Sequence, residues 1–147
     1  MSIIHFSKLK ASAIIPTTAT AAAAGFDLYS SDTISVEPLK SVVVDTGISA
    51  IFPKGTYGRI ADKSGRVLTT CLVVCGGVID PDYIGPLKVL LRNLSTCCFY
   101  ITAGDCIAQL ICEKFEKPVI QEISPPTFIK TERGIAGLGS GIGYRKL

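Results

Sequence analysis

The sequence predicts an all-β domain, an antiparallel sandwich or jelly roll, and three observations support that prediction. Short runs rich in β-branched and aromatic residues alternate with turns built on glycine, proline and aspartate. No long window shows the 3.6-residue period of an amphipathic helix. Apolar residues make up 48% of the 147 residues, so the chain is long enough for one domain with a substantial core and too short for two.

Eight strands are expected, and each is bounded by turn-forming residues. They span residues 33–36, 41–44, 48–52, 56–61, 71–75, 87–92, 98–102 and 107–115. The turns between them include, in chain order, Glu37-Pro38, Pro53-Lys54-Gly55, Asp80-Pro81-Asp82 and Ala103-Gly104-Asp105. The alanine run at 21–24 is too short to hold a helix alone, so it is expected in a loop. A short helical turn is expected after Ser64.

Residues 131–147 differ in composition from the β domain expected over residues 1–130. Five of the 14 glycines lie in the segment GIAGLGSGIG, residues 134–143. A flexible linker has this composition, and so does an arm that wraps a phosphate chain with its main-chain N–H groups. Composition alone leaves these two interpretations open.

The charge balance excludes some functions. The net charge is +3, from 15 basic and 12 acidic residues, and no lysine and arginine cluster is present. This pattern argues against direct binding of nucleic acid and is compatible with a small anionic ligand. No apolar run is long enough to span a bilayer, and the start, MSIIHFSKLK, has the reverse order of a secretory signal. We expect a soluble intracellular protein without a membrane contact.

The six cysteines are expected to be reduced. Four of them lie in apolar runs such as CLVVC and LIC, where a free cysteine behaves as a small core residue. A zinc site is disfavoured because the chain has no CxxC pair and its single histidine, His5, is remote. A disulfide framework is disfavoured for an intracellular protein.

Three loops carry groups suited to a phosphorylated ligand. Lys63-Ser64-Gly65 combines a cation, a hydroxyl and a small residue, although a surface turn has the same composition. Asp80 follows an apolar strand and is either a turn former or a general base above a water molecule. Gln109 lies inside an apolar strand, so its amide is either paired in the core or directed at a ligand.

Five segments in fixed order make the chain similar to one family. They are AGFDLYS (24–30), GRIADKSG (58–65), GGVIDPDYIG (76–85), GDCIAQL (104–110) and RGIAGLGSG (133–141). These segments resemble the five motifs of the trimeric deoxyuridine triphosphatases (dUTPases) over nearly the whole chain. The resemblance implies a jelly-roll-like antiparallel β-barrel or sandwich with a glycine-rich C-terminal arm. It also implies Mg²⁺-dependent hydrolysis of dUTP to dUMP and pyrophosphate, which limits uracil in DNA, and a homotrimer whose sites are shared between subunits.

The same resemblance implies a role for each motif residue. Asp80 matches the carboxylate that orients and activates the attacking water, and Asp27 matches the aspartate that meets Mg²⁺ through water. Gly77, Val78 and Ile79 match the main chain that reads uracil, and Tyr83 matches the tyrosine beneath the deoxyribose. The full set of expected substrate contacts is Lys63, Ser64, Gly65, Gly77, Val78, Ile79, Tyr83, Lys88, Gln109, Arg133, Leu138, Gly139 and Ser140.

Several motif positions depart from the family pattern. The second motif usually reads Pro-Arg-Ser-Gly and here reads Asp62-Lys63-Ser64-Gly65, so the bidentate guanidinium is lost. The third motif has Ile84 in place of a basic or amide residue, and the fourth has Cys106 in place of arginine. In the arm, Leu138 replaces an aromatic residue and Gly141 replaces a threonine. These departures predict weaker substrate binding or slower closure of the arm.

Two other functions are compatible with this fold. A signalling or protein-binding module can keep a fold after losing the reaction. The related dCTP deaminases share an Ile-Asp-Pro segment, but their chemistry needs a glutamate about ten residues further on, where this chain has Leu90. The deaminase interpretation is therefore the weaker of the two.

Overall fold

Two antiparallel sheets that share one core form the centre of the β domain. The computed structural model describes residues 2–124, and all elements below lie within them. The strands and the helix are β1 (His5–Lys8), β2 (Phe26–Tyr29), β3 (Ile34–Val36), β4 (Ser41–Asp45), β5 (Ile48–Ile51), β6 (Thr56–Ala61), α1 (Ser64–Thr70), β7 (Leu72–Cys75), β8 (Val78–Ile79), β9 (Lys88–Asn93), β10 (Phe99–Ile101) and β11 (Cys106–Lys114).

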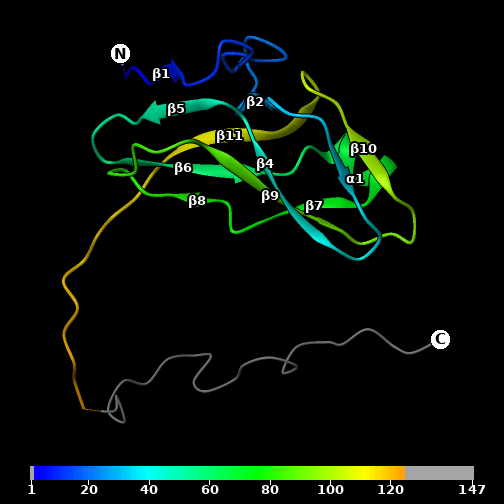
Figure 1. Cartoon of the computed structure of the whole chain (residues 1–147). Coiled ribbons are helices and arrows are strands. Elements are labelled where there is room, and N and C mark those ends of the chain that lie inside the picture. The colour runs from blue at the N-terminus through cyan, green and yellow to red at the C-terminus, as the bar shows by residue number, and fades with distance from the viewer. Residues whose placement is uncertain (1, 125–147) are drawn as a thin grey trace. The chain divides into compact units, whose positions relative to one another are not determined.

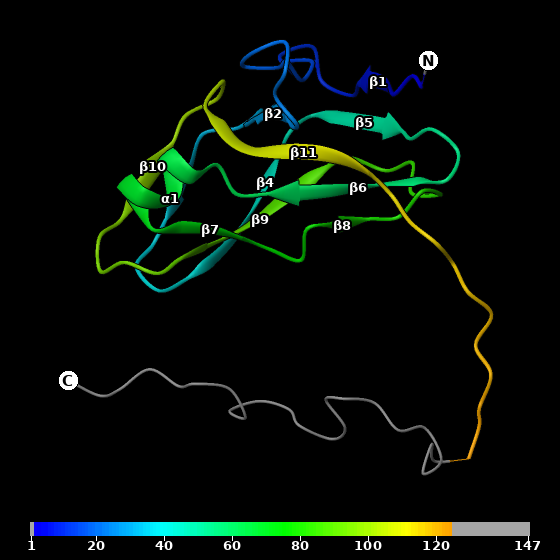
Figure 2. The same ribbon diagram turned by 180° about the vertical axis from the view of Figure 1, so that it is seen from behind.

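The larger sheet has the strand order β2-β11-β6-β8, and the second sheet has the order β4-β9-β7. Two short pairs, β1-β5 and β10-β3, complete the described part of the chain, and every pairing is antiparallel. Figures 1 and 2, seen from opposite sides, show β4 and β9 running obliquely across β6 and β11. The sheets do not close into a barrel. The prediction of an all-β antiparallel sandwich is confirmed.

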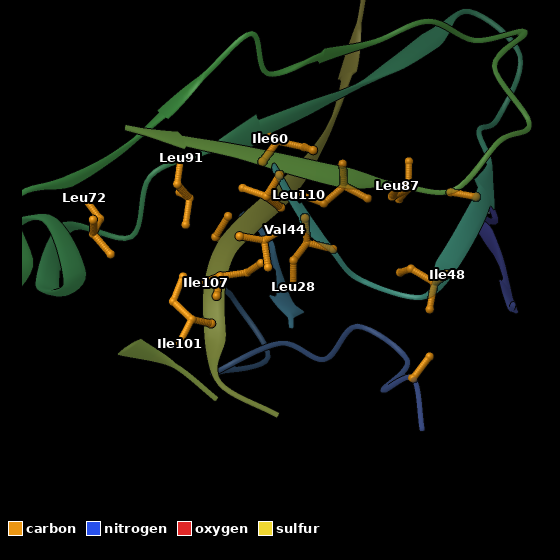
Figure 3. Close-up of a cluster of buried hydrophobic side chains, with 14 of the residues drawn as sticks. Leu28, Val44, Ile48, Ile60, Leu72, Leu87, Leu91, Ile101, Ile107 and Leu110 are labelled. Carbon is orange, nitrogen blue, oxygen red and sulfur yellow. The ribbon is translucent and has the colours of Figure 1, made fainter. Parts of the chain in front are cut away.

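The core lies between the two sheets. Leu28, Ile60 and Leu110 project from the larger sheet, and Val44 and Leu91 project from the smaller one (Figure 3). Each of these side chains is at most 4% exposed. Removing a buried leucine side chain at such a position costs about 2–5 kcal/mol, so the packing between the sheets holds the strands that carry the candidate site.

All eight predicted strands are present, with each boundary within one residue of the prediction. The helical turn expected after Ser64 is the first turn of α1, and the alanine run at 21–24 lies in a loop. The sequence did not predict β1, β2 or β8. These strands have four, four and two residues, and they are ordered by pairing with β5, β11 and β6 rather than by a pattern of their own.

The chain divides into a compact unit, Met1–Glu116, and a second unit, Lys117–Leu147. Residues 117–124 are exposed and have no regular secondary structure. The predicted domain boundary between residues 130 and 131 and the predicted glycine-rich arm lie outside the described residues. In the described part, the helix α1 has seven residues, and no helix there is long and apolar enough to cross a membrane.

All six cysteines are free thiols. The prediction that the cysteines of apolar runs are core residues is wrong for Cys71, which is exposed. Cys71 ends α1 in the left-handed conformation, with a φ of 56°, and its N–H caps the carbonyl of Val67, so its position at the helix end exposes it. Cys75, Cys106 and Cys112 are half-buried.

An ion pair joins β6 to β11 beside this core. Arg59 Nη2 lies 2.6 Å from Glu113 Oε1, and the hydroxyl of Tyr57 donates to Glu113 Oε2 at 2.6 Å. The hydrogen bond from Arg59, followed by that from Tyr57, lowers the pKa of Glu113 below its ordinary value. The carboxylate is therefore favoured in its charged form by the folded protein.

Replacing Glu113 by glutamine tests this contact through its pH dependence. Because the pKa of Glu113 is lower in the folded than in the unfolded protein, the contact stabilises the fold above the unfolded pKa. That stabilisation is lost as the pH falls through the folded pKa. Glu113→Gln is therefore expected to lower the Tm at about pH 7 and to have little effect at about pH 3. Thermal unfolding of both proteins at both pH values checks this, and an equal loss of Tm at the two values would contradict it.

Candidate active site

Three neighbouring strands bring together the predicted phosphate contacts. In the register of the larger sheet, Gln109 of β11 lies opposite Asp27 of β2 on one side and Ala61 of β6 on the other. Leu28 and Leu110 face the core, so Asp27 and Gln109 project from the opposite face of the sheet. Lys63 follows β6 by two residues. We call Asp27, Lys63, Ser64, Gly65 and Gln109 the Lys63 cluster.

A β-bulge sets this register. The pairing of β11 with β2 shifts between Cys106 and Ala108. As a result, the consecutive residues Ile107 and Ala108 are both buried, at 5% and 0% exposed, and the alternation starts again at Gln109. The bulge thus directs Gln109 to the outer face, although it lies in the apolar segment CIAQL.

An ion pair forms the centre of the Lys63 cluster. Lys63 Nζ lies 2.5 Å from Asp27 Oδ1, and the two side chains are 29% and 15% exposed. The hydrogen bond to Asp27 raises the pKa of the Lys63 ammonium, although partial burial acts in the opposite direction. Lys63 is therefore a fixed cation at neutral pH, held in place by Asp27.

Gln109 and Asp62 connect the cluster to its surroundings. The amide Nε2 of Gln109 donates to the main-chain oxygen of Asp62 at 2.7 Å, so this contact uses one N–H of the amide. The Asp62 carboxylate accepts the N–H of Val74 at 2.6 Å and so joins the loop before α1 to β7. Asp62, which replaces a usual proline, therefore anchors the loop that carries Lys63.

Ser64 and Gly65 begin α1 and are exposed. A Cβ atom added at Gly65 meets no atom within 4 Å, so nothing in the folded protein requires glycine there. In a helix, alanine is more stable than glycine by about 0.5–1 kcal/mol.

Gly65→Ala therefore tests ligand binding by a change that is not expected to lower the stability of the fold. We expect the Tm to stay equal or rise. The KM for dUTP, the substrate that the family resemblance implies, is expected to rise about tenfold because the added methyl group keeps phosphate oxygens away from the main chain. Steady-state kinetics and thermal unfolding of the same preparation check both values. An unchanged KM would show that Gly65 lies outside the substrate site.

A pocket of about 230 Å³ lies on the opposite side of β6 from β11. It is lined by Val78, Ile79, Asp80, Tyr83, Pro86 and Lys88, and we call it the Asp80 pocket. The main-chain N–H of Tyr83 donates to the carbonyl of Asp80 at 3.1 Å, so Asp80 begins a turn. Its carboxylate is exposed and accepts no hydrogen bond from residues 2–124.

Tyr83 is 42% exposed, so it is not a core residue. Its hydroxyl donates to the main-chain oxygen of Pro86 at 2.9 Å, which holds the ring along the pocket wall. Lys88 is exposed and lies opposite Asp45 in the register of β9 and β4. Both residues therefore line the pocket with side chains that a ligand can reach.

Gly77 allows β8 to approach β6. The N–H of Ile60 donates to the carbonyl of Gly77 at 2.7 Å, and a Cβ at Gly77 would lie 2.1 Å from the oxygen of Ile60. No side chain fits there. The close approach places Val78 and Ile79 at the edge of the sheet, with β6 on one side.

The Lys63 cluster and the Asp80 pocket are separate within one chain. Gln109 pairs with Ala61 of β6, whereas Ile79 of β8 pairs with Gly58 of β6. With a rise of ~3.3 Å per residue and ~4.8 Å between strands, these positions are roughly 14 Å apart across the sheet. The two halves therefore need either a long ligand or a second copy of the chain to meet.

The donor set fits a metal ion that arrives with a ligand. Residues 2–124 hold no cluster of three or more histidine, cysteine or acidic side chains suited to a metal. Asp27 offers a hard oxygen ligand, but Lys63 occupies one of its oxygens. Such a site suits Mg²⁺ carried by a triphosphate, since this ion keeps several of its waters.

Sequence reasoning missed Arg66, which lies beside the cluster, and the only signal for it was a second cation shortly after Lys63. The predicted contacts in the arm, Arg133, Leu138, Gly139 and Ser140, and the departure at Gly141 lie outside the described residues. The other predicted site residues fall into the Lys63 cluster and the Asp80 pocket, except Gly77, which precedes Val78 and contacts Ile60 of β6.

Comparisons with known proteins identify the family of the chain. Residues 11–142 match the dUTPase family model, and the chain belongs to the dUTPase family. It is 42% identical over 137 residues to the mitochondrial deoxyuridine 5'-triphosphate nucleotidohydrolase of Homo sapiens, covering 93% of this chain and 54% of that protein. It is 40% identical to the deoxyuridine 5'-triphosphate nucleotidohydrolase of Mus musculus, over 93% of this chain and 83% of that protein.

Solved structures of dUTPases share the fold. The dUTPase of Staphylococcus bacteriophage 80alpha with dUpNHpp has a TM-score of 0.89 at 24% identity, over 96% of this chain and 99% of that one. A mutant dUTPase from phage phi11 of S. aureus, described with a structural Mg(II) ion, has a TM-score of 0.79 at 23% identity, over 84% and 97%. The predicted fold, an antiparallel jelly-roll-like sandwich of the dUTPase type, is confirmed.

Proposed function

We propose that this chain hydrolyses dUTP to dUMP and pyrophosphate. The observation that carries the proposal is the exposed Asp80 carboxylate, which lines a pocket of about 230 Å³ in a chain of the dUTPase family. Water attacks the α-phosphorus, the bond from that phosphorus to the bridging oxygen breaks, and pyrophosphate leaves. Asp80 holds the water and accepts its proton.

Uracil is read by the free edge of β8. In the larger sheet β8 is the last strand, paired with β6 on one side, so its other main-chain edge faces outward. Main-chain N–H and C=O groups of Gly77 to Ile79 there match the donors and acceptors of a pyrimidine edge. Val78 and Ile79 line the pocket, and Tyr83 supports the sugar. Lys88 adds a positive charge at the same pocket.

The Lys63 cluster binds the triphosphate. Lys63 supplies a fixed charge, Ser64 a hydroxyl and Gly65 an accessible main chain, while Gln109 offers the amide oxygen and hydrogen that its contact with Asp62 leaves available. Asp27 is the residue that would meet Mg²⁺ through water. Magnesium, when bound, neutralises charge on the pyrophosphate leaving group.

The active form is a homotrimer that unites the two halves of the site. The separation of roughly 14 Å between them in one chain is removed if the Lys63 cluster of one subunit faces the Asp80 pocket of another. Val78 and Ile84 beside Asp80 are 64% and 77% exposed, as expected of apolar side chains that a second surface covers. Arg133, Leu138, Gly139 and Ser140 complete the site from a third subunit.

The test is pyrophosphate release from dUTP in the presence of Mg²⁺, compared with release from dTTP, dCTP and UTP under the same conditions. Release from dUTP alone is expected, and EDTA is expected to abolish it. Equal release from all four would contradict uracil and deoxyribose recognition. No release from purified oligomer would indicate that the fold serves binding instead.

A further inference from the structure

One cation near the candidate site has no part in the motifs. Arg66 lies in the first turn of α1, directly after Ser64 and Gly65. Its Nε donates to the main-chain oxygen of Cys106 at 2.8 Å, across 40 residues of sequence. Its Nη2 lies 3.8 Å from Asp105 Oδ2, and the side chain is 34% exposed. The guanidinium thus joins α1 to the first residues of β11.

This contact falls at the bulge that orients Gln109. Cys106 is the residue at which the register of β11 shifts, and its thiol lies near Asp27 and Lys63. Burial and the Asp27 carboxylate raise the pKa of that thiol, while the positive charges of Lys63 and Arg66 act against the rise. Cys106 therefore remains a neutral thiol at neutral pH and contributes no charge to the cluster.

We propose that Arg66 is a positioning residue for the triphosphate site. Arg66 joins α1 to β11 and supplies the positive charge that Cys106 does not carry. Because Arg66 holds the start of α1 against β11, it fixes Lys63 and Ser64 relative to Gln109. Its half-exposed guanidinium adds a second fixed cation beside Lys63. This inference rests on the proposed function and deepens it by adding a residue outside the five motifs.

Arg66→Leu removes the guanidinium and keeps much of the apolar stem. Loss of a hydrogen bond and charge of this kind is expected to weaken binding of dUpNHpp by at least about tenfold, with a matching rise in the KM for dUTP. Binding of dUMP, which lacks the β- and γ-phosphates, is expected to change less than threefold or so. A purely structural role would weaken both ligands alike or neither.

Arg66→Lys and a second-site change complete the design. Arg66→Lys keeps the charge but loses the planar fork, so its affinity is expected to lie between wild type and Arg66→Leu. Adding Cys106→Arg to Arg66→Leu returns a positive charge to the start of β11, near Asp27 and Lys63, and is expected to recover most of the lost affinity for dUpNHpp. Arg92→Leu, an exposed arginine on β9 whose Nη1 lies 3.4 Å from Ser41 Oγ, is the matched control for loss of one charge.

The outcomes are distinct. Wild type that releases no pyrophosphate from dUTP overturns the proposed function, whereas active wild type with an unchanged affinity in Arg66→Leu overturns the role of Arg66 alone. Equal losses for dUpNHpp and dUMP, or losses of the same size in Arg92→Leu, also overturn it. A selective loss that Cys106→Arg reverses supports it.

Discussion

Asp80→Asn is expected to lower kcat for dUTP hydrolysis by about 10²- to 10⁴-fold, with a KM and a Tm close to those of the wild type. Asparagine has the size of aspartate but is neutral and accepts no proton from water. The Asp80 carboxylate is exposed and accepts no hydrogen bond from residues 2–124, so its replacement breaks no contact there. Steady-state kinetics of pyrophosphate release and thermal unfolding measure the two properties separately.

Asp82→Asn is the matched control for this change. Asp82 is an exposed aspartate two residues further along the same turn and lies outside the Asp80 pocket. It removes the same charge from the same loop, and we expect its kcat to stay within about threefold of wild type. Equal losses in the two variants would show that the loop acts through its overall charge and would remove Asp80 from the role of base.

The eight expected strands were predicted because each is a run rich in β-branched and aromatic residues, bounded by turn-forming residues. β8 was missed because its two residues, Val78 and Ile79, are too few to form such a run. The strand exists because Gly77 permits a main-chain contact with Ile60. β2 is short and is ordered by its pairing with β11. Structure created by tertiary contacts leaves little trace in a local pattern.

The residues of the candidate site also divide into those that the sequence indicated and those that it did not. Lys63, Asp80 and Gln109 were identified by residue type and by their place in motifs, because charged and amide groups in apolar surroundings are informative. Arg66 was missed because its partner, the main-chain oxygen of Cys106, has no signature in the sequence. The role of Asp62 was missed likewise, since a carboxylate that accepts the N–H of Val74 looks in the sequence like an unfavourable charge.

Two inactive variants are expected to regain activity when their subunits are mixed. Lys63→Ala removes the fixed cation of one half-site, and Asp80→Asn removes the base of the other. In the proposed homotrimer, each variant alone is expected to lose at least about 10² in kcat/KM, because the charge of Lys63 and the base are both needed at every site. In a mixed trimer, an intact Lys63 from an Asp80→Asn subunit faces an intact Asp80 from a Lys63→Ala subunit.

When the two variants are mixed at random in equal amounts, each half-site is intact with a probability of about 0.5. About one quarter of the sites therefore have both an intact Lys63 cluster and an intact Asp80 pocket. Mixing after reversible dissociation, or co-expression with two affinity tags, followed by pyrophosphate release measures this recovery. If one chain supplied both halves, no site in any mixture would be complete and activity would remain at the level of the single variants. The roughly 14 Å between the half-sites across one sheet favours recovery, because an in-line attack needs the base and the phosphate-binding groups on the same bound nucleotide.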